Sequence, residues 1–217
     1  MSDTATRDQI LDAAERLFAE QGFARTTIKQ IGREAGVNSA LLYYYFADKE
    51  ELYQEVLQRL IGNLVRRTSG SLDNPGPPAS RLRALVEAQA EVIASNPRFP
   101  RLLVRELAES DAAHAVGQIH VLAATTFRRL CDLVREGQAA GVFRRGLDPR
   151  FAAISVVSQV AYFAIARPAI RILLDTGPDG PSLDTLRGFA RHAADFALAA
   201  LTAPPAVARR RRARSAG

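Results

Sequence analysis

Apolar residues recur along most of the chain at the three- and four-residue spacing of an amphipathic helix, and the alternation typical of β-strands is almost absent. The pattern predicts an all-α fold of about nine helices. We expect them at about residues 7–21, 27–35, 38–47, 48–68, 80–95, 100–109, 112–139, 148–174 and 182–201. Pro168 falls inside the eighth of these, where it should kink or split the helix.

Residues that favour helix ends mark the first four helices most clearly. Three capping boxes are expected: Thr6 with Gln9, Thr27 with Gln30, and Asp48 with Glu51. Gly22 should end the first helix, and Gly36 stands where a left-handed residue commonly ends a helix. Asn38 or Ser39 is the expected N-cap of the third helix. Only a short turn then separates the second and third helices.

Two short helices joined by a glycine-containing turn, after a longer packing helix, form the helix-turn-helix layout, in which the second helix enters the major groove. On a helical wheel of the third helix, Leu42 and Phe46 share the inward face. The outward face carries Ala40, Leu41, Tyr44 and Tyr45, with Ser39 and Tyr43 on its flanks. Leucine and tyrosine are unusual on a solvated surface. They suit DNA, because a tyrosine hydroxyl can bond a phosphate and leucine can touch a thymine methyl group.

The alternative is that these aromatic residues form only a core stripe, but the wheel, the turn and the caps favour DNA binding. Thr27 and Lys49 stand at the starts of the second and fourth helices, where unpaired N–H groups attract phosphate. Lys29 and Arg25 could add phosphate contacts.

A stretch rich in serine, glycine and proline at residues 69–78 predicts a break after the fourth helix. We place the domain boundary just before it. The expected units are a DNA-binding domain at residues 1–65, a sensing and dimerisation domain at 66–203, and a disordered basic tail at 204–217.

The net charge of +6 changes this picture little, because five arginines lie in the last nine residues. Without them the chain has 24 basic and 23 acidic side chains, and residues 1–65 have seven basic and ten acidic. DNA binding must therefore depend on a local basic patch and on a dimer, with a modest salt dependence per monomer.

Composition also argues against several classes of protein. No apolar stretch reaches the roughly 18 residues that a membrane span needs, the start of the chain is polar, and the single cysteine excludes an internal disulfide framework. We therefore expect a cytoplasmic protein without membrane contact. Gly-rich phosphate loops, HExxH, CxxC and GxSxG are absent, and three histidines leave little for acid–base chemistry. We expect no enzyme activity, no metal and no cofactor.

Residues 6–60 carry a specific combination of motifs. They are Ile10-Leu-x-Ala-Ala-x-x-Leu-Phe, Gly22-Phe-x-x-Thr-Thr-Ile-x-x-Ile, and Ala35-Gly-Val followed by Leu-Tyr-Tyr-Tyr-Phe-x-x-Lys49-Glu. This combination resembles the TetR/AcrR family of bacterial regulators. The resemblance implies DNA contacts from Thr27, Asn38, Ser39, Ala40, Leu41, Tyr43, Tyr44, Tyr45 and Lys49. Family members often have lysine or glycine where this chain has Ser39 and Ala40, and a polar residue at Leu41, so base readout should lean on shape and methyl contacts.

The resemblance also implies that the second half dimerises and holds a small-molecule effector. The last two long helices should form the homodimer, through Phe151, Ile154, Val157, Phe189, Ala193, Phe196 and Ala197. The alternative is that both helices belong to the core of one chain. Polar residues on otherwise apolar helices are the candidates for effector binding: Arg105, Glu106, His120, Arg128, Tyr162 and Arg167. Arg105 and Glu106 could instead form an ordinary surface or interhelical pair.

Together these features predict a homodimeric repressor that binds a palindromic operator in double-stranded DNA and is released by an unidentified effector. The other interpretation is a helical protein-interaction module without DNA binding, which would leave the outward-facing residues of the third helix unexplained.

Overall fold

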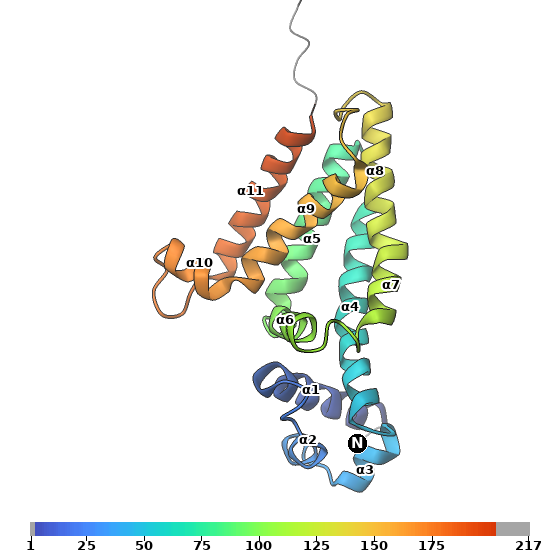
Figure 1. Cartoon of the computed structure of the whole chain (residues 1–217), viewed down its shortest axis with the longest axis vertical. Helices are drawn as coiled ribbons and strands as arrows, with labels where there is room; N and C mark the ends of the chain where they lie inside the picture. The colour runs from blue at the N-terminus through green and yellow to red at the C-terminus, as the bar shows by residue number, and fades with distance from the viewer. Residues whose placement is uncertain (1–2, 203–217) are drawn as a thin grey trace, which may run out of the picture.

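The computed structural model describes residues 3–202 and shows eleven α-helices and one π-helical segment there (Figure 1). In chain order these are α1 (Asp3–Gln21), α2 (Ile28–Ala35), α3 (Ser39–Tyr45), α4 (Lys49–Leu72), α5 (Pro78–Ser95), α6 (Phe99–Glu109), α7 (Val116–Leu122), the π-helical η1 (Ala123–Phe127), α8 (Arg128–Ala139), α9 (Pro149–Ile165), α10 (Arg167–Leu173) and α11 (Leu183–Leu201). The predicted all-α fold is confirmed. The predicted tail at residues 204–217 lies outside the described part of the chain.

The helices form two groups that α4 connects (Figure 1). A small group of α1, α2 and α3 surrounds the first half of α4, and we call it the reading head. The second half of α4, with α5 and α7 to α11, forms the other group, which we call the upper bundle. It packs around α5, which contacts α4, α8, α9 and α11. Helix α6 lies between the two groups and contacts α1.

The start of α1 differs from the prediction. The helix begins at Asp3, so Thr6 lies within its first turns, and the predicted capping box of Thr6 with Gln9 is wrong. Ile10, Ala14 and Phe18 are fully buried, as the apolar pattern required.

Helix α4 also runs further than predicted. It continues to Leu72, through the Ser69-Gly70-Ser71 stretch that suggested a break. Tertiary packing accounts for this, because Leu72 and Thr68 are buried. The hydroxyls of Thr68 and Ser69 both bond that of Thr126, at 3.3 and 2.8 Å. These contacts outweigh the low helix propensity of serine and glycine.

The predicted eighth helix is split at its proline, as expected. It ends at Ile165, and α10 starts at Arg167 with Pro168 in its first turn. The axes of α9 and α10 differ by 83°. Among residues 3–202 no single helix is long and apolar enough to cross a membrane, and α9 and α10 reach that length only when they are counted together across their bend.

Candidate nucleic-acid interface

Helix α2 is held at both ends by the residues that the sequence indicated. The Thr27 hydroxyl accepts a hydrogen bond from the Gln30 backbone N–H, and the Gln30 side chain accepts one from the Thr27 N–H at 2.8 Å. The predicted capping box is therefore present. Gly36 ends the helix in the left-handed conformation, with φ of 68°.

The turn between α2 and α3 requires a second glycine. A Cβ atom on Gly32 would lie 2.8 Å from the backbone oxygen of Val37, and the Val37 N–H donates to the Gly32 carbonyl at 2.8 Å. This close approach fixes the orientation of α3 relative to α2.

Helix α3 has the two faces that its wheel predicted. Asn38 caps it, and the side-chain oxygen of Asn38 accepts from the Leu41 N–H at 2.8 Å. Leu42 and Phe46 are buried. On the opposite side Tyr44 is 75% exposed and Tyr43 54% exposed, and Leu41 is also exposed. Such apolar exposure on one short helix is the mark of a contact surface.

Tyr45 differs from this prediction. It is only half-exposed, and its hydroxyl donates to the Asp3 carboxylate at the start of α1. That hydrogen bond raises the pKa of Tyr45. Its ring packs edge-on against Tyr44, with centroids 5.1 Å apart. Tyr45 therefore anchors α3 to α1 and orients Tyr44.

Lys49 is likewise engaged inside the reading head. Its Nζ donates to the carbonyls of Phe23 and Thr26, at 2.9 and 3.1 Å, and lies 4.2 Å from the centre of the Phe23 ring. Lys49 thus clamps the start of α4 to the α1–α2 loop and uses two of its three N–H donors.

The unpaired positive charge of the reading head lies on α2 and on the segments that flank α2 and α3. Arg7, Arg16 and Arg59 form ion pairs with carboxylates. The other four basic residues of the head have no ion pair among the described residues: Arg25, Lys29, Arg33 and Lys49. Lys29 and Arg33 lie on α2, Arg25 lies in the loop before it, and Lys49 is the first residue of α4. Arg25, Lys29 and Arg33 are exposed, so a head with excess acidic residues still carries unpaired positive charge on and next to α2.

The candidates for effector binding do not form one site. Arg105 and Arg167 line the same open cleft. Glu106 is buried, and its carboxylate accepts from the backbone N–H of His114 at 2.7 Å. His120, Arg128 and Tyr162 are exposed and do not line this cleft. Spacing along a helix could not show this, because the cleft forms between distant helices.

Three further arginines line that cleft and were missed from the sequence: Arg98, Arg101 and Arg171. A signal for them existed. Arg98, Arg101 and Arg105 follow the i, i+3, i+7 spacing of one helix face, and Arg167 and Arg171 follow i, i+4.

The residues expected at the dimer interface separate into an exposed and a buried set. Phe151, Ile154 and Phe196 are exposed, and Val157 and Phe189 are partly buried. Ala193 and Ala197 are buried within the chain, so the structure removes them from any intermolecular surface. Tyr162 on α9 and Ile172 on α10 are further exposed apolar residues in this half of the chain.

Comparisons with known proteins cover both halves of the chain. Residues 10–56 match the family model described as bacterial regulatory proteins, tetR family, and residues 78–196 match the tetracyclin repressor-like C-terminal domain. The chain is 30% identical over 159 residues to the HTH-type transcriptional repressor NicS of Pseudomonas putida, covering 73% of this chain and 74% of NicS.

Two solved structures share the fold. The TetR family transcriptional regulator PfmR of Thermus thermophilus superposes with a TM-score of 0.71 at 26% identity, covering 89% of this chain and 99% of PfmR. The regulator FadR of Bacillus subtilis, solved in complex with stearoyl-CoA, also has a TM-score of 0.71, at 19% identity, covering 89% of this chain and 98% of FadR.

Proposed function

Because the chain belongs to the TetR family of bacterial regulatory proteins, we propose that it is a DNA-binding transcriptional repressor which a small-molecule effector releases from its operator. The observation that carries the proposal is the exposed face of α3, with Leu41, Tyr43 and Tyr44, on a head whose α2 and preceding loop carry exposed, unpaired basic residues. The relative NicS is named as a repressor, and the FadR structure holds a small-molecule ligand.

In this proposal α3 lies in the major groove. Tyr43 and Tyr44 donate their hydroxyls to phosphate oxygens, and Ala40 and Leu41 contact thymine methyl groups. Lys29, Arg25 and Arg33 neutralise phosphates along the flanking backbone. Asn38, Thr27 and Ser39 position the helix starts, while Lys49 and Tyr45 act as supports that fix the geometry of the head.

A homodimer supplies the second reading head. The exposed apolar residues of α9 and α11, including Phe151, Ile154 and Phe196, are the surface that we assign to the partner. A two-fold dimer reads two inverted half-sites about 34 Å apart. We place the protein in the cytoplasm, where bacterial DNA is accessible to it.

The experiment that tests this function is selection of genomic fragments by the purified full-length protein, followed by footprinting. We expect a protected palindrome whose half-site centres lie about one helical turn apart. Absence of any sequence-specific protection would contradict the proposal and would favour a helical protein-interaction module.

A further inference from the structure

An open cleft of about 1270 Å³ lies where the reading head meets the upper bundle. The C-terminal end of α1, helix α6, the bend between α9 and α10, and the loop after α10 enclose it. Five arginines line it: Arg98, Arg101, Arg105, Arg167 and Arg171. The acidic residues of the lining are Glu20, Glu109 and Asp179.

Much of this positive charge is not neutralised within the chain. Arg101, Arg167 and Arg171 have no ion pair in the part of the chain that the structure describes. Arg167 donates to the backbone carbonyls of Asp179 and Pro181, at 2.9 and 3.3 Å, and Arg171 to that of Pro178 at 3.3 Å. These bonds hold the guanidinium groups in place without cancelling their charge. Such an arrangement is ready for a carboxylate or phosphate.

Apolar groups lie beside the arginines. The cleft wall includes Val104, Ile165 and Pro168. A smaller recess of about 50 Å³ adjoins it and shares Pro97, Pro100, Ala164 and Arg167 with it. The recess is otherwise lined mainly by apolar residues and can hold only the end of a ligand. Those apolar residues are Ile93, Phe163, Leu183 and Leu186. A ligand that satisfies both surfaces has an anionic head and an apolar chain.

We propose that this cleft is the effector site and that it binds an amphipathic organic anion, with a carboxylate or phosphate head on the arginines and an apolar chain along the apolar part of the cleft wall. This inference rests on the proposed function, because it names the ligand class and the place at which that ligand acts.

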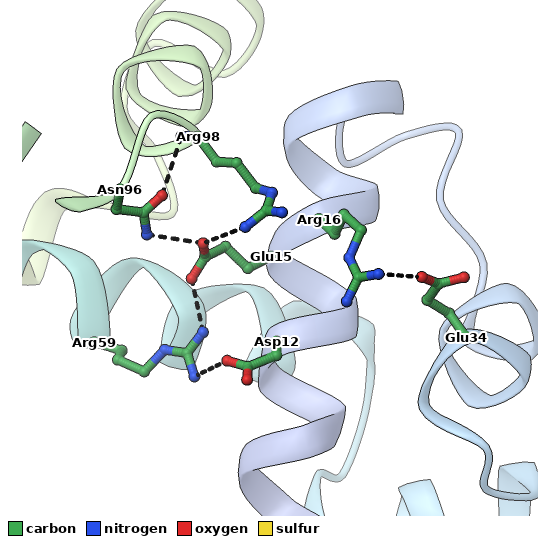
Figure 2. A network of polar contacts seen from close by, with 7 residues as sticks. All are labelled: Asp12, Glu15, Arg16, Glu34, Arg59, Asn96 and Arg98. Atoms are coloured by element: carbon green, nitrogen blue, oxygen red, sulfur yellow. Dashed lines mark hydrogen bonds and ion pairs between the residues drawn. The ribbon is translucent and has the colours of Figure 1, made fainter. Parts of the chain in front are cut away.

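Two arginines of the cleft also contact the reading head. Arg105 donates to the backbone carbonyl of Glu20 at the end of α1, at 3.1 Å, and pairs with Glu109 at 2.8 Å. Arg98 lies 4.0 Å from the carboxylate of Glu15 on α1 (Figure 2).

Glu15 joins α1 to α4 and to the α5–α6 loop. It is buried, and it accepts from Arg59 of α4 at 2.7 Å and from Asn96 of the α5–α6 loop at 2.8 Å (Figure 2). An anion in the cleft competes with Glu15 for Arg98, and with the Glu20 carbonyl for Arg105. Ligand binding therefore acts directly on the contacts that set the position of α1, and with it the spacing of the reading heads.

The test uses octyl phosphate, octanoate and neutral octanol as probes, titrated by calorimetry into the full-length protein. We expect both anions to bind and octanol to bind at least tenfold more weakly. The variant Arg101→Gln with Arg171→Gln should weaken anion binding at least tenfold. The matched control is Arg66→Gln with Arg145→Gln, which removes two exposed charges outside the cleft and should leave binding unchanged.

The second measurement is operator affinity by fluorescence anisotropy, with and without octyl phosphate. We expect the anion to weaken operator binding at least tenfold in the parent protein and not in the Arg101→Gln, Arg171→Gln variant. Equal binding of octanol, or equal loss in both double variants, would overturn the anion site. Anion binding without any effect on operator affinity would overturn its role as the effector site. A protein that binds the anions in the cleft but no DNA sequence would instead disprove the repressor function and leave the site standing.

Discussion

Tyr43 and Tyr44 provide the most direct test of the DNA interface. Both are exposed and have no hydrogen-bond partner among residues 3–202. Replacing both by phenylalanine removes the hydroxyls but keeps the rings, and we expect operator affinity to fall about tenfold or more, since a hydrogen bond to a charged group contributes about 1.5–3 kcal/mol. Replacing both by alanine should cost more, because ring contacts with sugar and methyl groups are also lost. Anisotropy titrations would measure both effects.

Tyr45→Phe is the matched control for this prediction. It removes a hydroxyl that bonds Asp3 and faces the start of α1. We expect a lower melting temperature with little direct loss of phosphate contact. If Tyr45→Phe weakens DNA binding more than the double Tyr43→Phe, Tyr44→Phe variant does, the division between contact and support residues is wrong.

For single residues, the sequence predicts the burial and the capping roles that depend only on position within one helix. Leu42 and Phe46 face inward because of their positions on a helical wheel, and Thr27 caps α2 because Gln30 is three residues away. The supporting roles of Tyr45 and Lys49 could not be predicted in this way. Their partners Asp3 and Phe23 lie 42 and 26 residues away in the chain, and only the fold brings them together.

Among the elements, the α2–α3 turn depends most strictly on one residue. Gly32→Ala would place a methyl group against the Val37 carbonyl oxygen. We expect a loss of about 1–3 kcal/mol in the free energy of unfolding, together with weaker operator binding, because α3 would be displaced. Chemical denaturation and anisotropy would show both effects.

Gly70→Ala is the matched control and should have the opposite sign. Gly70 is helical, and a Cβ atom there would meet nothing within 4 Å. Alanine should therefore stabilise the protein by about 0.5–1 kcal/mol. A destabilising Gly70→Ala would mean that the end of α4 is not the helix that the structure shows.

The cap of α9 gives a pH-dependent prediction. Asp148 accepts from the backbone N–H of Arg150 and pairs with its guanidinium, and these bonds lower the pKa of the Asp148 carboxyl from 3.8 to about 2. Because the folded-state pKa is the lower one, the stabilisation is present above pH 4 and is lost as the pH falls from about 4 toward 2. The melting temperature of Asp148→Ala should lie below that of the parent protein at pH 7, and the difference should shrink below pH 4. A difference that stays constant down to pH 3 would contradict the role of the charge.

The helix boundaries show that tertiary packing can override the local sequence signals that usually end a helix. Pro168 splits its helix because the proline ring and its missing N–H act locally. The Ser69-Gly70-Ser71 stretch does not end α4, since Thr126, more than fifty residues away, bonds Thr68 and Ser69. The arginine cleft, too, could be predicted only in part from the sequence. Its two arginine series are each visible as a helical spacing, but the fact that α6 and α10 face one cleft is a property of the fold.

At the scale of the whole molecule, the proposed homodimer must hold two reading heads at a fixed distance. Phe151 on α9 and Phe196 on α11 are 69% and 61% exposed. Large aromatic side chains in water on two neighbouring helices favour burial against a partner. Replacing both by glutamate should therefore give a folded monomer of about 23.6 kDa in place of the proposed dimer.

Because the proposed palindrome is read by two heads held together, this monomer should also bind the full palindrome at least a hundredfold more weakly, while α3 and the basic residues of α2 remain intact. The measurements are light scattering, circular dichroism and anisotropy on one preparation. Val121→Glu is the control, since Val121 is an exposed apolar residue on α7, away from α9 and α11. If the Phe151→Glu, Phe196→Glu variant stays dimeric, the partner surface lies elsewhere. If it is monomeric yet keeps full operator affinity, a single head is sufficient for recognition, and effector control through head spacing would lose its basis.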